Sequence, residues 1–517
     1  MRTSTEESSL QEELSVILAQ LQQRLGNSPD LIMRSIRIPS SPTTHVTALH
    51  IDGLIDKQMM NDSGLCSNLA GSGSDLTTHG STIQEGVYSL LYNHASALCE
   101  VSTTRTLDGV LASILSGDTV LLIDGIAEAI CCGTKGGESR GVDEPTTQVV
   151  IRGPKDSFNE TLATNISLVR RRIRNPDLWL EKMKLGKKTQ TEVAIMYMKN
   201  TVDDELVQEV KHRLQKANLS AVLESGAIEE MIQDQTATFF PTIYNSERPD
   251  VIAANLLEGR VAILVDGTPF ALLVPTVFAQ FFQSPDDYYN RFDVGIFLRM
   301  LRYICYLISL LLPSVYIAAI TFHQDMIPTT LLISIASARD GIPFPAFIEA
   351  MLMELSFEVL REAGVRMPRA MGQAVSIVGA LVLGQAAVQA GIVSTAMVIV
   401  VSITGIASFS TPAYNVAISA RLIRLFIMIL AATLGFYGIL LGCIVLLAHM
   451  CSLKSFGIPY MAPFAPFRLF DQKDNILRMP RWSFIKRSRL IHQEEAAESW
   501  GRAMNASSKD SSDSKGE

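Results

Sequence analysis

The stretch GALVLGQAAVQAGIVSTAMVIVVSITGIASFST, residues 379–411, decides what kind of protein this chain is. It contains no Asp, Glu, Lys or Arg, and between Met371 and His449 the only such side chains are Arg421 and Arg424. An apolar helix of about 20 residues crosses the roughly 30 Å hydrocarbon core of a membrane. We therefore predict that the C-terminal part of the chain is an all-α polytopic membrane domain.

Four segments are predicted as membrane spans: 297–322, 371–390, 391–411 and 422–449. Arg299 and Arg302 lie in the first turns of the first span, where long basic side chains can reach the lipid headgroups. Residues 327–338 are too short to cross, and residues 344–360 carry three glutamates, which favours a re-entrant segment and an interfacial or pore-side helix. Four to six crossings stay open, and an even count keeps the basic segment 468–489 in the cytoplasm with the head.

The first 290 residues, in contrast, mix charged and apolar side chains as water-soluble domains do. An apolar run ends in Asp-Gly three times, at residues 52–53, 124–125 and 266–267. Asp-Gly after a β-branched run favours a type I′ hairpin, because both central residues need a positive φ. Residues 120–130 and 261–274 are therefore predicted to be strand–turn–strand units. Their similarity hints at two related subdomain cores.

Other elements of the head follow from periodicity. Leucines at helical spacing predict a helix near residues 14–25, and a strand at 191–198 is followed by a helix at 203–218. The fold class is therefore a two-part α/β (α+β) soluble head followed by the membrane domain. The predicted domains are an N-terminal helix and polar lead at 1–44, soluble subdomain 1 at 45–180, soluble subdomain 2 at 181–294, a transmembrane domain at 295–467 and a basic, then disordered, cytoplasmic tail at 468–517.

The composition and motifs argue against several function classes. A net charge of −8 repels phosphate, so a nucleic-acid partner is not expected. Seven cysteines, without a CxxC pair or paired histidines, indicate neither a disulfide scaffold nor a zinc site. The stretch KLGKKT at 184–189 lacks the first glycine of a P-loop, and neither HExxH nor GxSxG occurs. We therefore expect no enzyme, no catalytic residue, no metal and no cofactor.

Isolated acids in the apolar part are candidates for function, because a carboxylate in hydrocarbon costs several kcal/mol. Glu354, Glu358 and Arg361 share one helix face by their spacing, and Glu349 precedes them in the same segment. Two interpretations stay open: ion pairs such as Glu358 with Arg361, or an acidic ring in an oligomer that concentrates cations at a pore mouth. Glu349, Glu354 and Glu358 are therefore pore or gating candidates.

Two amides in the deciding stretch are further pore or gating candidates. Gln385 and Gln389 lie one turn apart among glycines and alanines. Small residues let helices approach closely, which explains the glycines and alanines by packing alone. Buried amides seek partners or water, so the two glutamines add a case for a hydrated path.

A basic run at residues 170–174 lies on a predicted helix, near an alternating set of charges. Such runs are solvated faces, contacts with anionic lipid or contacts between subunits. The three interpretations stay open. The subunit-contact candidates are Arg140, Glu144, Arg152, Arg170, Arg171, Arg172 and Arg174.

Long motifs in both parts resemble one known family. They include RGVDEPTTQVVIRGPKDSFNETLATNISLVRRRIRNPDL (140–178), ERPD (247–250), FHQDMIPTTLL (322–332), GIPFPAFIEA (341–350) and SFGIPY (455–460). They resemble the A subunits of spore germinant receptors, the GerA family of endospore-forming bacteria, over roughly residues 45–467. Gln148 stands where the family usually has Glu, and Asp156-Ser157 replace a Glu-Gly pair, so one charge available to a neighbouring arginine is missing.

The resemblance implies a receptor subunit in the spore inner membrane, with its head on the core side. Such A subunits assemble with a transporter-like B subunit, which binds amino acids or sugars, and with a lipoprotein C subunit. They are thought to form a homo-oligomeric ring, a pentamer, whose membrane helices line a cation channel that nutrients open. Two other functions stay open: a stage V sporulation AF-type paralogue that assists dipicolinate release, and a non-conducting membrane scaffold.

Overall fold

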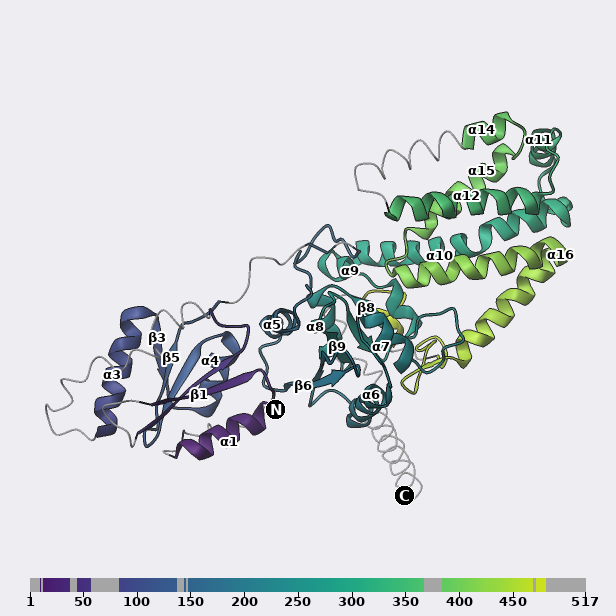
Figure 1. Ribbon diagram of the computed structural model, residues 1–517. Helices are drawn as coiled ribbons and strands as arrows, with labels where there is room; N and C mark the ends of the chain where they lie inside the picture. Colours follow the sequence, from purple (N-terminus) through teal and green to yellow (C-terminus); the bar gives the residue numbers. More distant parts are fainter. Residues whose placement is uncertain are drawn as a thin grey trace, which may run out of the picture. The chain divides into compact units, whose positions relative to one another are not determined.

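The computed structural model describes residues 10, 13–37, 44–56, 83–136, 144–145, 147–366, 384–467 and 471–479. The chain divides into two compact units (Figure 1). The head unit consists of Met1–Gln233, Ile243–Pro275 and Arg489–Glu517. The helical unit consists of Asp234–Thr242 and Thr276–Ser488, so a short segment from within the head sequence belongs to it.

The described part of the head unit contains two five-stranded antiparallel sheets. Sheet one has the order β1-β2-β4-β5-β3, from β1 (Leu31–Arg37), β2 (His45–Ile51), β3 (Val101–Thr104), β4 (Thr119–Ile123) and β5 (Ala129–Cys132). Sheet two has the order β6-β7-β9-β10-β8, from β6 (Leu178–Leu185), β7 (Thr191–Met198), β8 (Tyr244–Ser246), β9 (Val261–Val265) and β10 (Ala271–Val274).

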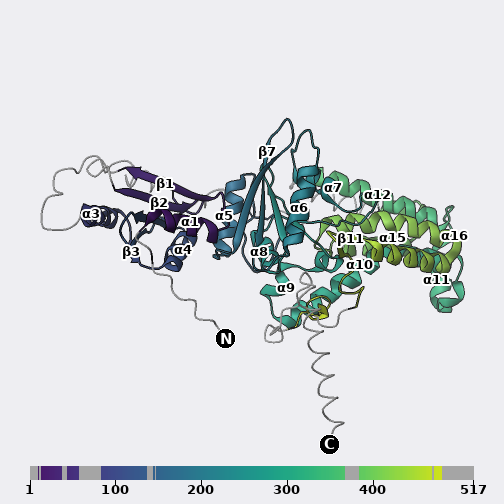
Figure 2. The same cartoon turned by 90° about the horizontal axis from the view of Figure 1, so that it is seen from below.

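The two sheets have the same topology, because adding five to each strand number of sheet one gives the order of sheet two. The helices correspond as well, and Figure 2 shows those around sheet two. The pairs are α1 (Leu14–Arg24) with α5 (Leu162–Arg172), α3 (Ile83–Leu98) with α6 (Asp204–Lys216) and α7 (Ser225–Ile232), and α4 (Leu107–Ser116) with α8 (Pro249–Leu257). The head is thus an internal duplication, as the two Asp-Gly hairpins suggested.

The Asp-Gly turns have the same structural role in both halves of the head. Asp124 Oδ1 accepts a hydrogen bond from the backbone N–H of Leu14 at 3.1 Å, and Asp266 Oδ1 accepts one from Leu162 at 3.1 Å. Each aspartate therefore caps the first helix of its own half, where free N–H groups favour an anionic acceptor. The predicted hairpins β4–β5 and β9–β10 are confirmed. The type I′ turn is wrong, because only Gly125 and not the aspartate before it has a positive φ.

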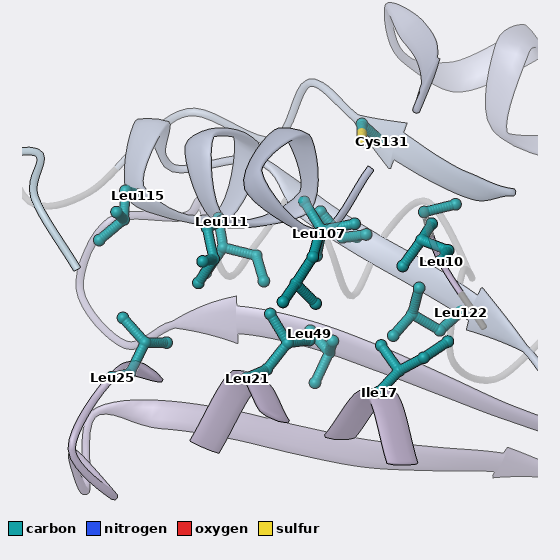
Figure 3. Close-up of a cluster of buried hydrophobic side chains, with 14 of the residues drawn as sticks. Leu10, Ile17, Leu21, Leu25, Leu49, Leu107, Leu111, Leu115, Leu122 and Cys131 are labelled. Atoms are coloured by element: carbon teal, nitrogen blue, oxygen red, sulfur yellow. The ribbon is translucent and has the colours of Figure 1, made fainter. Parts of the chain in front are cut away.

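Sheet one is covered on both faces. On one face, Ile17 and Leu21 of α1 and Leu107 and Leu111 of α4 pack with Leu49 of β2 (Figure 3). The other face packs against α3, through side chains that alternate with those of the first face: Val87, Leu91, Ala95, Ala48, Leu121, Ile123 and Ile130. Because β1 pairs with β2 along its whole length, it belongs to this sheet and not to the predicted lead 1–44.

The helical unit is built from long helices that lie side by side (Figure 1). Helix α10 packs against α12, α15 and α16. Among the described residues, two helices, α10 and α16, are long and apolar enough to cross a membrane by length and composition. The helices are α9 (Pro285–Tyr289), α10 (Phe292–Thr321), α11 (Thr329–Arg339), α12 (Ala346–Arg366), α14 (Gly384–Gln389), α15 (Thr395–Ser408) and α16 (Tyr414–Ser452).

Helix α16 folds back on itself at Gly435, which has φ 64° and ψ −142°. A methyl group at Gly438 would collide with the carbonyl of Leu430, and one at Gly442 would lie 3.1 Å from Cδ1 of Leu430. In a straight helix, residues eight and twelve apart are about 12 and 18 Å apart. Two antiparallel limbs, 414–434 and 436–452, therefore replace the predicted single span 422–449 (Figure 1).

The other predicted spans agree with the observed helices to different degrees. The first is a helix, as expected, and begins at Phe292. The third is shorter than predicted, since α15 has 14 residues and is about 21 Å long. Most of the predicted span 371–390 lies outside the described residues, which include only α14 from it. The expected short element at 327–338 corresponds to α11, and all three glutamates of the acidic segment 344–360 lie in α12, which begins at Ala346.

Candidate functional site

The three candidate glutamates of α12 all meet arginines of the same chain. Glu354 and Arg424 form the most buried of these pairs, with Oε2 2.6 Å from Nη2. Arg424 also donates to the backbone oxygen of Ser309 in α10 at 3.0 Å. One ion pair therefore joins α10, α12 and the first limb of α16. Removing one partner of such a pair would leave an uncompensated buried charge.

Glu358 lies one turn further along α12 and is partly exposed. Its Oε1 is 2.8 Å from Nη1 of Arg361, and its Oε2 is 2.8 Å from Nη1 of Arg421 in α16. Arg361 also donates to Oγ of Ser408 in α15 at 3.3 Å. The local pair Glu358–Arg361 is the ion pair that the spacing suggested. The link to α16 was not visible in the sequence, because Arg421 is distant along the chain.

Glu349 joins another set of elements. Its Oε2 accepts hydrogen bonds from N and Oγ of Ser394, at 3.0 and 2.9 Å, and so occupies the N-terminus of α15. Its Oε1 lies 3.0 Å from Nη2 of Arg339, the last residue of α11. Gln385 and Gln389, in contrast, are exposed on α14. The five pore or gating candidates therefore divide into paired acids and exposed amides, and their role in a pore stays a prediction.

The net charge around Glu354 and Glu358 determines whether these acids can attract cations in a single chain. Glu354 and Glu358 face Arg361, Arg421 and Arg424, which leaves the ionised cluster with one net positive charge. Paired acids do not concentrate cations, since the neighbouring arginines cancel their field. The acids would serve a cation path only after the pairs separate.

The segment Asp234–Thr242 binds both limbs of α16. Ser419 Oγ in the first limb donates to the backbone oxygen of Phe239, and the ring of Phe239 lies 5.9 Å from that of Phe426. Nε2 of His449, in the second limb, lies 2.9 Å from Oγ1 of Thr238. This segment follows α7 and precedes β8, so the chain of the head runs through it. Only the isolated Ser419 and His449 in an apolar run could have signalled this contact.

A second polar network lies at the start of α10. Arg299 is fully buried, with Nε 3.1 Å from Oδ2 of Asp287 and Nη1 2.7 Å from the backbone oxygen of Asp474. Arg302 Nη1 lies 2.8 Å from Oδ1 of Asp287. Burial raises the pKa of the Asp474 carboxyl, and Arg299 acts against that rise. The expectation that these arginines reach lipid headgroups is wrong, because their charges are bound by aspartates.

The subunit-contact candidates of the head are dispersed. Glu144 is exposed and lies 3.2 Å from Nζ of Lys155, and Arg152 and Arg174 are exposed. Arg140 lies outside the described residues.

The other three candidates have partners inside the chain. Arg171 donates to the backbone oxygen of Gly136 at 3.2 Å, and Arg172 lies 2.6 Å from Asp156. Arg170 is 1% exposed and binds both carboxylate oxygens of Asp30, at 2.8 and 3.2 Å. Arg170 therefore forms a buried ion pair within the head, and its side chain does not reach the surface where another subunit would bind.

A duplicated α/β head followed by a bundle with long apolar helices and buried ion pairs defines a membrane-type protein with a soluble head. The chain belongs to the GerA family, the Bacillus/Clostridium GerA spore germination proteins, whose model matches residues 19–490. Membership in this family supports a role in spore germination.

Three similar proteins show how far the likeness extends. Spore germination protein KA of Bacillus subtilis (strain 168) is 50% identical over 478 residues, which is 92% of this chain and 86% of that protein. Spore germination protein GerLA of Bacillus cereus is 40% identical over 488 residues, 94% of this chain and 97% of that protein. The N-terminal domain of the A subunit of the Bacillus megaterium germinant receptor GerK3 is 36% identical and covers 52% of this chain and 98% of that domain, with a TM-score of 0.41.

Proposed function

We propose that this chain is the A subunit of a spore germinant receptor and that several copies form a nutrient-gated cation channel in the spore inner membrane. The head would lie on the core side, and a transporter-like B subunit and a lipoprotein C subunit would be its partners. The family and the similarity to germination proteins over most of the chain support this proposal. We expect a homo-oligomeric ring, a pentamer, embedded in membrane lipid.

The observation that carries the channel proposal is the buried Glu354–Arg424 pair between three helices. Ionisable groups inside a membrane bundle are costly and therefore mark functional positions. With the pair closed, the acids of α12 are neutralised and the path offers cations no favourable charge. Separation of α12 from α16 would expose Glu354 and Glu358 together, which would provide an acidic lining.

The segment Asp234–Thr242 supports a route by which the head acts on this gate. It is continuous with the head sequence and binds both limbs of α16, whose first limb carries Arg421 and Arg424. A displacement of the segment would pull on the helix that holds the acids of α12. This gives the proposed gate a mechanical input without a nutrient site on this chain.

The test is cation flux from liposomes that contain the chain and its two partner subunits. Nutrient addition should release cations, and liposomes without this chain should not. Glu354→Gln should increase the leak without nutrient by about tenfold, since a loss of 1.4 kcal/mol in the closed state shifts the equilibrium by that factor. Glu362→Gln is the matched control, because Glu362 forms an exposed pair with Arg366 on the same helix. Absence of nutrient-dependent flux would contradict the proposal.

One observation favours a second function, the non-conducting scaffold. In this chain the candidate acids Glu349, Glu354 and Glu358 are each held by an arginine, as in a sealed bundle. A scaffold predicts that Glu354→Gln changes neither cation flux nor the rate of germination in spores that contain normal amounts of the protein. The leak measurement therefore distinguishes the two functions.

A further inference from the structure

An exposed loop of the head carries two aliphatic side chains that the other described residues leave uncovered. In the loop 147–154, Val149 is 75% exposed and Ile151 is 96% exposed, whereas Val150 between them is buried. The loop thus alternates like a strand, with one side chain turned into the unit and its neighbours turned into solvent. Exposed aliphatic side chains grouped in this way mark sites of contact with a partner.

The loop is held firmly by the ERPD motif. Oε1 of Glu247 accepts hydrogen bonds from N and Oγ1 of Thr147, at 2.6 and 2.8 Å, and from N of Gln148 at 3.0 Å. Arg248, fully buried, donates to the backbone oxygens of Gln148 and Pro154 at 3.2 and 2.9 Å. Both ends of the loop are therefore fixed by Glu247 and Arg248, two consecutive residues between β8 and α8.

A fixed loop has already lost the conformational freedom that a binding partner would otherwise have to restrict. Preorganisation of this kind increases affinity, because less entropy is lost when the complex forms. Val149 and Ile151 are β-branched and stiff, which adds to this effect. The loop is therefore better described as a preformed contact than as a mobile connection.

The charges around the loop favour a protein partner over a lipid surface. Residues 144–160 contain two basic side chains, Arg152 and Lys155, and three acidic ones, Glu144, Asp156 and Glu160, which gives a net charge of −1. Anionic membranes attract clusters of basic residues, and interfacial loops are rich in aromatic side chains. The segment has one aromatic residue, Phe158, and it is buried.

A complementary surface exists on the same unit, at α7. Leu223, just before this helix, is 81% exposed, and Met231 in its last turn is 49% exposed. Glu224 and Glu230 are exposed beside them, so an apolar pair is flanked by negative charge. In the loop, the two aliphatic side chains are followed directly by the positive side chain of Arg152, which can pair with one of these glutamates.

We propose that the loop 147–153 of one copy of this chain docks on the α7 surface around Leu223 and Met231 of a second copy, with Arg152 facing Glu230. Because the two surfaces differ, the contact is head-to-tail, and contacts of this type close into rings when the rotation permits. The inference rests on the proposed function, because a ring requires one contact that repeats between neighbouring copies. The loop and the α7 surface would form that contact.

The first test is the number of copies in the purified full-length chain, measured as mass in lipid nanodiscs. Ile151→Asp should lower the fraction of multi-copy particles at least about tenfold, since a buried charge at the centre of a contact abolishes it. Tyr92→Asp is the matched control, because Tyr92 is also exposed and apolar but lies on α3, and it should change nothing. Unchanged assembly of Ile151→Asp would overturn the inference, as would a wild-type chain that stays single.

The second test excludes a folding artefact and identifies the receiving surface. Two differently tagged full-length chains, one with Ile151→Cys and one with Leu223→Cys, are mixed in a Cys451→Ser background, which removes an exposed native thiol. A short bismaleimide should link the two tags, and Tyr92→Cys in place of Ile151→Cys should not. Absence of the mixed product overturns the inference.

The outcomes also separate this inference from the proposed function. Assembly that depends on Ile151, with no cation flux in reconstituted liposomes, would support the contact and contradict the channel. Assembly and flux that both survive Ile151→Asp would support the channel and overturn the contact.

Discussion

The head and the helical unit each bury an arginine with a carboxylate, but the two pairs are satisfied to different degrees. Arg170 in the head makes bonds to Asp30, Ser28 and Leu178 O, and both oxygens of Asp30 are bound. In the Glu354–Arg424 pair of the helical unit, Oε1 of the acid and Nε of the arginine have no hydrogen-bond partner among the described residues. The carboxylate oxygens of the head pair are therefore both hydrogen-bonded, whereas one oxygen of Glu354 is not.

This difference in hydrogen bonding indicates which of the two units can change its conformation more easily. A fully bonded buried pair fixes one geometry, because any displacement breaks several bonds at once. A pair with unsatisfied atoms costs free energy in the closed state, and so the helices that carry it separate more easily. The buried pair thus fixes its surroundings more strongly in the head than in the helical unit.

The largest expected effect is at Arg170. Arg170→Ala should lower the free energy of unfolding of the head by about 3–5 kcal/mol, because it leaves Asp30 buried without its partner. Trp179, whose ring lies against Gly26 in the same region, reports unfolding by fluorescence in denaturant. Arg174→Ala, at an exposed position of the same basic run, should cost less than about 0.5 kcal/mol. Equal losses would remove the distinction between internal and surface arginines.

The second effect tests the incomplete pair. Glu354→Gln and Arg424→Gln should each destabilise the helical unit by about 3 kcal/mol, at the lower end of the range for buried pairs, since two of its atoms are already unpaired. The double variant should recover part of the loss, because it leaves no unpaired charge. Thermal unfolding of the full chain in detergent gives the three values. Additive losses would mean that the two side chains do not interact.

Local signals in the sequence predicted much of the head. The repeated Asp-Gly after apolar runs indicated two related halves, and the leucine spacing of residues 14–25 indicated α1, because these patterns depend on neighbours in the chain. The pair Glu358–Arg361 was visible for the same reason. Asp30 and Arg170 are 140 residues apart, and Glu354 and Arg424 are 70 apart, so only the fold brings them together.

The fold-back of α16 was missed for a different reason. Its two limbs form one continuous apolar run, and hydropathy does not distinguish one long helix from two antiparallel ones. The available signal was the spacing of Gly435, Gly438 and Gly442, which allows the limbs to approach closely. The segment Asp234–Thr242 was missed because it is short and its contacts are distant in the sequence.

The third effect tests whether α16 folds back at Gly435. Gly435→Ala should destabilise it by about 1–3 kcal/mol, since its backbone conformation is open almost only to glycine. The new methyl group would also meet Cε1 of His323 at 2.8 Å. Gly405→Ala in α15 has open space around it and should be neutral or stabilising by up to about 1 kcal/mol. Opposite signs in thermal unfolding are expected, and a loss at both sites would contradict the fold-back.

The smallest effect tests the duplication of the head. Asp124→Ala and Asp266→Ala should each cost about 1 kcal/mol of unfolding free energy, because each removes the cap of the first helix in its half. Equivalent roles predict equal losses, and the double variant should lose the sum, since the two caps share no partner. Denaturant unfolding of the full chain measures all three variants. A loss at one site alone would show that the halves share a topology without sharing the energetic role of this turn.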